Sequence, residues 1–130
     1  MISRRVLLFG LVGLTAALVH WVVVWLLVQH GKFAALWANP FGFFVAFWVS
    51  YFGHRHGSFA EKNHRHRIRE TLPKFALVAS AGFVLNEFLF FLLLRWTPLP
   101  YTVALILVIG IVAVGTFLAS RHWAFVRAEA

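Results

Sequence analysis

The stretch YFGHRHGSFAEKNHRHRIRET, residues 51–71, is strongly basic and lies between two long apolar runs. It contains five Arg or Lys residues and four His residues, whereas the whole chain is 62% hydrophobic and only 12% charged. Ordinary soluble domains are about a quarter charged, so this composition is typical of a membrane protein. In such a chain, a basic stretch either binds a ligand or determines the membrane topology.

Four apolar runs are long enough to cross a membrane. They carry no formal charge apart from Glu87 in the third run, and they cover residues 6–29, 33–53, 75–94 and 96–120. An α-helix rises about 1.5 Å per residue, so about 20 residues cross a hydrocarbon core of about 30 Å. The sequence therefore predicts an all-α membrane protein with four transmembrane helices. The first run exceeds the about 7–15 residues of a signal-peptide core, which favours a transmembrane helix over a cleaved signal peptide.

The basic residues are distributed unequally between the two sides of a four-span chain. Only Lys32 and Arg95 fall on one side. The ten on the other side are Arg4, Arg5, Arg55, Lys62, Arg65, Arg67, Arg69, Lys74, Arg121 and Arg127. Short cytoplasmic loops carry the excess of Lys and Arg, so this bias predicts a multi-pass membrane protein with both termini and the middle loop in the cytoplasm.

Other interpretations of the basic stretch find less support. A loop of about twenty residues has no recognisable nucleic-acid-binding fold, so we expect no nucleic-acid partner. Its four histidines, His54, His56, His64 and His66, lack the carboxylates, thiols and regular spacing of a zinc site, so no metal is expected. Attraction to anionic lipid or to a phosphate head group is a generic property of such a stretch, at about 1 kcal/mol per Lys or Arg.

The chain contains an internal repeat. RHGSF at 55–59 recurs as RHWAF at 121–125, each directly after an apolar run, and RRVLLFGLVG at 4–13 is echoed by PKFALVASAG at 73–82. Each half crosses the predicted membrane twice, so the repeats are parallel and related by a pseudo-twofold axis along the membrane normal. We therefore expect two parallel-repeat helical hairpins.

These features resemble the GtrA-like family of small four-span membrane proteins, whose second and fourth spans close with a pattern like N-R-x-[WF]-x-F. Arg55 and Phe59 match this pattern in the first half, and Arg121, Trp123 and Phe125 match it in the second. The chain departs from it at three positions, where His54 and Ser120 replace Asn and Gly57 replaces the aromatic residue.

The resemblance implies a single GtrA-like transmembrane domain over residues 1–130. Its parts are repeat 1 at about 4–59, a basic cytoplasmic loop at about 54–73, and repeat 2 at about 73–127. It also implies a role in cell-surface polysaccharide synthesis, either moving a polyprenyl-phosphate-linked sugar across the cytoplasmic membrane or assisting the glycosyltransferase that makes it.

Polar residues within the spans are candidates for a site. An ionised carboxylate at the bilayer centre costs about 2.5–3.5 kcal/mol on insertion scales, so Glu87 should face the bundle interior or a water-filled cavity. Asn86 lies beside it, and Asn39 precedes Gly42, Ala46 and Ser50 on one face of the second run. In the first run, His20 follows Gly10, Gly13 and Ala17 on a small-residue face, which we expect to make a close contact with another helix. We expect His20, Asn39, Asn86 and Glu87 to form one polar cluster. The alternative is that they only hold the bundle together, at about 0.6 kcal/mol per bond.

Arg55, His56, Arg121 and His122 form the second candidate site, at the predicted cytoplasmic ends of the two repeats. They are placed to bracket the phosphate of a lipid carrier through charge-assisted hydrogen bonds. The alternative is that these side chains reach to the lipid head groups and mark helix ends. The chain has no Asp, no Cys and no Gly-rich phosphate loop, so we expect neither enzyme activity nor a cofactor.

The leading hypothesis is therefore translocation of a polyprenyl-phosphate-linked monosaccharide. We also expect an oligomer, because four short spans enclose little volume. Two alternatives remain. One is a membrane adaptor that anchors a glycosyltransferase through the basic loop, and the other is a small proton-coupled exporter of lipophilic cations that depends on Glu87.

Cysteine accessibility tests the predicted topology. The chain has no cysteine, so single substitutions report their own positions. We expect Asn63→Cys and Ala130→Cys to react with a membrane-impermeant maleimide only after permeabilisation, and Ala34→Cys and Pro98→Cys to react in intact cells. Labelling of Asn63→Cys from outside would contradict the orientation, and Pro98→Cys and Ala130→Cys on the same side would remove the fourth crossing.

Overall fold

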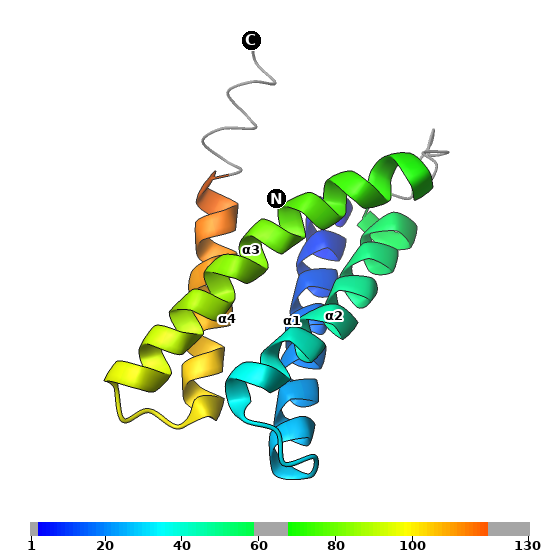
Figure 1. The fold of residues 1–130 in the computed structure, drawn as a ribbon. Helices are drawn as coiled ribbons and strands as arrows, with labels where there is room; N and C mark the ends of the chain where they lie inside the picture. Colours follow the sequence, from blue (N-terminus) through cyan, green and yellow to red (C-terminus); the bar gives the residue numbers. More distant parts are fainter. Residues whose placement is uncertain (1–2, 59–67, 120–130) are drawn as a thin grey trace. The chain divides into compact units, whose positions relative to one another are not determined.

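The computed structural model describes residues 3–58 and 68–119, and the regular structure in these ranges is helical with no strand. Figure 1 shows the path of the chain. The elements are α1 (Arg4–Gln29), α2 (Ala35–Gly53), the π-helix η1 (His54–Ser58), α3 (Ile68–Trp96) and α4 (Tyr101–Ala119). The all-helical class predicted from the sequence is confirmed for this part of the chain.

Within residues 3–58 and 68–119, three helices are long and apolar enough to cross a membrane. The candidate spans are Val6–Gln29, Ala35–His56 and Leu72–Trp96. The apolar part of α4 within the described residues, Tyr101–Thr116, is shorter. The fourth crossing and the cytoplasmic location of the termini therefore stay predictions.

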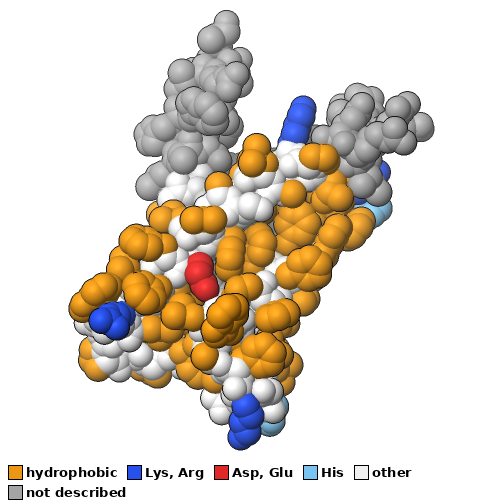
Figure 2. Space-filling model, viewed as in Figure 1, with side chains coloured by type: hydrophobic (Ala, Val, Ile, Leu, Met, Phe, Trp, Pro, Cys, Tyr) orange, Lys and Arg blue, Asp and Glu red, His pale blue; other side chains and the backbone are white. Residues whose placement is uncertain are grey.

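The exposed surface of the helices is largely apolar. Leu14 of α1 is 69% exposed, Leu77 of α3 is 74% exposed and Ile106 of α4 is 57% exposed. Apolar side chains cover most of the face in Figure 2, and Lys and Arg side chains lie at helix ends. Apolar surface on this scale is unfavourable in water and favourable in lipid.

Contacts within the chain define two compact units, residues 1–81 and 82–130, which divide inside α3. The first unit contains α1, α2, η1 and the beginning of α3, and the second contains the rest of α3 and α4. The organisation into two sequence repeats stays a prediction.

In the first unit, α1 and α2 form an antiparallel hairpin. Phe9 near the start of α1 stacks on His54 at the far end of α2, with ring centroids 4.6 Å apart, whereas His20 pairs with Asn39 near the start of α2. The connection is short because Lys32 takes φ 63°, a left-handed conformation that L-residues other than Gly seldom adopt. This turn returns the chain within five residues of the end of α1.

Glycines on α2 allow the two helices to approach closely. A Cβ at Gly42 would lie 2.8 Å from the backbone oxygen of His20, and one at Gly53 would lie 2.7 Å from a methyl group of Val12. The small residues expected to do this on α1 do not, because a Cβ at Gly10 or Gly13 would meet nothing within 4 Å. The close contact therefore depends on α2.

The ends of the basic stretch are helical. Residues 54–58 continue α2 as η1, and α3 begins at Ile68, seven residues before the apolar run that starts at Phe75. Hydropathy identifies the membrane-crossing part of a helix, and the hydrogen-bonded backbone extends beyond it into more polar sequence. Residues 59–67 lie outside the described part of the chain.

In the second unit, residues 97–100 connect α3 to α4. The Thr97 hydroxyl donates to the carbonyl of Leu93 at 2.6 Å and accepts from the backbone N–H of Leu99 at 3.3 Å, so it stabilises the end of α3 and the turn. Phe90 of α3 and Leu105 and Val108 of α4 are fully buried.

Substitution of Gly42 tests the close contact between α1 and α2. Gly42→Ala places a methyl group against the backbone of His20, so the helices must separate, and we expect a loss of about 1–3 kcal/mol in the free energy of unfolding. Unfolding would be followed in mixed micelles by SDS titration. Gly10→Ala is the matched control, because its methyl group has open space and should not lower stability. Equal losses in the two variants would contradict the contact.

Candidate functional site

A buried hydrogen bond links His20 of α1 to Asn39 of α2. His20 Nε2 lies 2.7 Å from Asn39 Oδ1, with His20 6% exposed and Asn39 fully buried. The Asn39 oxygen is an acceptor, so the imidazole donates through Nε2. Leaving either group unpaired in this environment would cost about 1–3 kcal/mol, which explains why the two are brought together.

A cleft of about 170 Å³ opens beside this pair, between α1, α2 and the first part of α3. Its walls combine small, aromatic and polar side chains. The lining residues are Ala16, Ala17, His20, Phe43, Ala46, Phe47, Ser50, Phe75 and Ala79. All of them belong to the first unit. The small residues leave the space open, and His20 and Ser50 supply the polar groups.

Aromatic contacts fix the inner wall of the cleft. The ring of Phe75 on α3 lies 5.5 Å from the rings of Phe47 and Tyr51 on α2, measured between centroids. His54 lies 6.3 Å from Phe75 and is stacked on Phe9, so it joins α1, α2 and α3. Its buried ring therefore has a packing role at the position where the family pattern has Asn.

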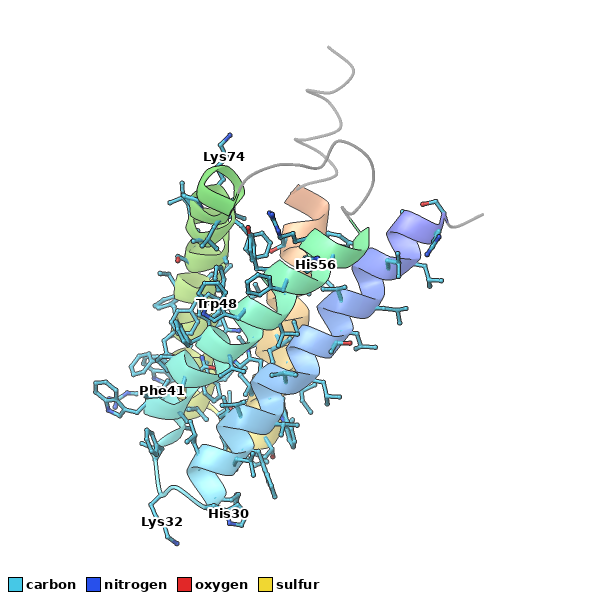
Figure 3. All side chains as sticks on the ribbon, turned by 90° about the vertical axis from the view of Figure 1, so that its right-hand side faces the viewer. His30, Lys32, Phe41, Trp48, His56 and Lys74 are labelled. Atoms are coloured by element: carbon cyan, nitrogen blue, oxygen red, sulfur yellow. The ribbon has the colours of Figure 1, made fainter. Side chains whose placement is uncertain are left out.

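A cationic region lies at the η1 end of the hairpin. Arg55 is half-buried in η1, and His56 is exposed and stacks on Phe52 with ring centroids 6.2 Å apart. Figure 3 shows His56 and Lys74 toward this end of the first unit, and His30 and Lys32 at the other end. A π-helical turn is often found at functional sites, because its wider hydrogen-bonding pattern changes the direction of the side chains.

Asn86 is buried and Glu87 is half-buried, and both belong to the second unit. Of the expected four-residue cluster, the structure shows the pair of His20 and Asn39, and the inclusion of Asn86 and Glu87 stays a prediction. Arg121 and His122 lie outside the described residues. Among residues 3–58 and 68–119, no three His, Asp or Glu side chains come together as a metal site.

Sequence reasoning identified Gly42, Ala46 and Ser50 as one face of α2, and it missed the aromatic wall. Phe43 and Phe47 are spaced four residues apart beside that face, which was a usable signal. Phe75 could not be found in this way, because its contact with α2 joins residues that are distant in the sequence.

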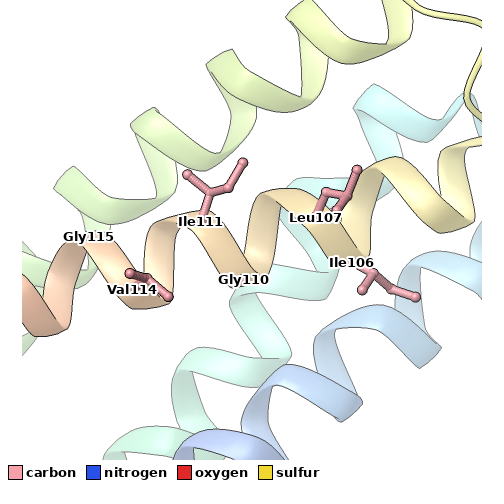
Figure 4. Close-up of a pocket in the computed structure, with 6 residues that line it drawn as sticks. All are labelled: Ile106, Leu107, Gly110, Ile111, Val114 and Gly115. Atoms are coloured by element: carbon pink, nitrogen blue, oxygen red, sulfur yellow. The ribbon is translucent and has the colours of Figure 1, made fainter.

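A second groove runs along α4 and is entirely apolar (Figure 4). It is lined by Ile106, Leu107, Gly110, Ile111, Val114 and Gly115. None of these side chains is a hydrogen-bonding group that could orient a polar ligand. The cleft beside His20 is therefore the better candidate for recognition of a polar group.

Comparison with known proteins bears on the chain as a whole. No curated protein and no solved structure gives a significant match. The family model described as GtrA/DPMS, transmembrane domain, matches residues 8–125 and so covers α2, α3, α4 and α1 from residue 8 onward. The apolar helices and this match together identify a multi-pass membrane protein. The chain belongs to the GtrA/DPMS transmembrane domain family.

Proposed function

We propose that the protein moves a polyprenyl-phosphate-linked monosaccharide across the bacterial cytoplasmic membrane, as a non-enzymatic step in the synthesis of cell-surface polysaccharide. Membership of a family related to glycosyl lipids and polysaccharides supports the substrate class. The observation that carries the proposal is the arrangement within one hairpin. A buried polar pair lies beside a cleft within the apolar spans, and a cationic region lies at the hairpin's η1 end.

This arrangement matches the three chemical parts of the substrate. The sugar is polar, the phosphate is anionic and the polyprenyl tail is apolar. Transfer of a hydroxyl group from water to a hydrocarbon costs about 4–8 kcal/mol, so a sugar with several hydroxyl groups crosses a plain bilayer very slowly. Polar groups inside the spans lower this barrier, and each reduction of about 1.4 kcal/mol raises the rate about tenfold. The tail can stay in the lipid throughout.

Arg55 is the proposed phosphate-binding residue in the first half of the chain, with His56 beside it. A guanidinium group offers paired N–H donors that match phosphate oxygens. Arg121 and His122 have the same role by their position in the repeated motif, and they lie outside the described residues. We further propose that the protein acts as an oligomer, because helices of this length enclose little volume.

A reconstituted transport assay tests the function. Undecaprenyl-phosphoryl-glucose with a labelled sugar would be placed in one leaflet of liposomes, and exposure of the label on the other leaflet would be followed over time. We expect Arg55→Ala and Arg121→Ala each to reduce the protein-dependent rate about tenfold to a hundredfold, because a hydrogen bond to a charged group contributes about 1.5–3 kcal/mol. Lys32→Ala, at the opposite end of the hairpin, is the control and should transport like the parent.

The same liposomes separate the alternatives. Equal rates with and without protein would contradict translocation and favour an adaptor that recruits a glycosyltransferase. Efflux of a lipophilic cation driven by a proton gradient, and lost in Glu87→Gln, would instead support the exporter. Glu87→Gln with normal transport of the sugar lipid would place the acid outside the transport mechanism.

A further inference from the structure

One ring nitrogen of His20, which lines the cleft of the first unit, has no hydrogen-bond partner among the described residues. The Cδ2–Nε2 edge of the His20 ring faces α2, because Nε2 contacts Asn39 Oδ1 and Cδ2 lies 2.8 Å from where a Cβ of Gly42 would be. In an imidazole ring, Nδ1 lies opposite this edge. His20 lines the cleft, and its bond to Asn39 is its one side-chain hydrogen bond among residues 3–58 and 68–119.

The bond to Asn39 also fixes the chemistry of this atom. Because Nε2 carries the proton that is donated to Asn39, Nδ1 of the neutral ring is a hydrogen-bond acceptor. A buried acceptor without a donor costs about 1–3 kcal/mol, so the cleft favours an occupant that offers an O–H or N–H group. The Ser50 hydroxyl, which also lines the cleft, makes no hydrogen bond within the described part of the chain.

The lining residues restrict the class of ligand. They include no carboxylate and no Lys or Arg, so neither a cation nor a phosphate would find an opposite charge there. Phe43, Phe47 and Phe75 offer apolar ring surfaces, and His20 and Ser50 offer hydrogen bonds. A sugar ring has this combination, with C–H groups on its faces and hydroxyl groups around its edge. The volume of about 170 Å³ equals that of about six water molecules, which suits one hexose ring.

We propose that this cleft binds the single sugar ring of the transported lipid, with one sugar hydroxyl donating to Nδ1 of His20 and the aromatic side chains contacting the ring faces. The inference rests on the proposed function for the identity of the lipid. The cleft is also close in sequence to the proposed phosphate-binding residue, because Arg55 of η1 follows Ser50 of α2 by five residues. The sugar and its phosphate therefore have neighbouring positions at the junction of α2 and η1.

Three substitutions alter the cleft in different ways. Ala79→Leu fills it from α3, and Ala81→Leu adds the same bulk at an exposed position of the same helix, as a matched control. His20→Gln keeps an amide donor for Asn39 and removes the imidazole acceptor. Ser50→Ala removes a hydroxyl without adding bulk, so it keeps the test valid if Ala79→Leu fails to fold.

The experiment measures equilibrium binding of two radiolabelled lipids to the full chain in nanodiscs. The probes are undecaprenyl-phosphoryl-glucose and undecaprenyl phosphate, which lacks the sugar. We expect the parent to bind the sugar-bearing lipid more tightly, Ala79→Leu to bind it at least tenfold more weakly than the parent, and His20→Gln about threefold to tenfold more weakly. Ser50→Ala should bind it about threefold more weakly, and Ala81→Leu should match the parent. Binding of undecaprenyl phosphate should be the same in all variants.

Failure of the cleft and failure of the function give different results. A parent that binds both lipids equally, or cleft variants that bind the sugar-bearing lipid like the parent, would overturn the proposed sugar site. If the parent shows the expected preference but transports nothing in liposomes, the sugar site stands and the proposed function fails. If the parent transports and Ala79→Leu transports equally well, the function stands and the sugar site fails.

Discussion

The hydrogen bond between His20 and Asn39 joins α1 to α2, and both side chains are buried between these two apolar helices. Both groups are too polar to be left unpaired there, so the two helices must meet with these residues opposite each other. Gly42 makes that meeting possible, because any side chain at this position would collide with the backbone of His20. The orientation of the imidazole, and with it the polar edge of the cleft, follows from this single contact.

Aromatic packing closes the hairpin at its other end. His54 is buried against Phe9 and lies near Phe75, so it occupies with a ring the position where the family pattern has a smaller amide. The beginning of α3 is attached to α2 through Phe75. The cleft therefore lies between a polar contact and an aromatic contact. Small residues such as Ala46 and Ala79 line it and leave its space open.

The helical class and the approximate positions of the three candidate spans could be predicted from hydropathy alone, because each of these apolar runs is long enough to cross the hydrocarbon core. The polar positions could also be identified, since His20 and Asn39 stand out in apolar sequence. Which polar residues pair could not be predicted, because helical spacing assigns a residue to a face and does not identify the helix opposite it. For the same reason, Gly10 and Gly13 were expected at a close contact that Gly42 makes. The start of α3 at Ile68 was missed because hydropathy does not detect a helix outside the apolar run.

For the proposed transport, a modest site is better suited than a strong one. A carrier must bind its substrate well enough to remove it from one leaflet and weakly enough to release it at the other, as ion-conducting pores must do with their ions. Hydrogen bonds to the His20 acceptor and the Ser50 hydroxyl would contribute about 0.5–1.5 kcal/mol each to binding of the sugar. The aromatic side chains contact the faces of the sugar ring without fixing it in a single position. A charged group in the cleft would hold a phosphate too tightly at mid-membrane. In the proposed mechanism, the half-buried Arg55 of η1 would keep the strong interaction near the head groups, where water can replace the protein as the partner of the phosphate.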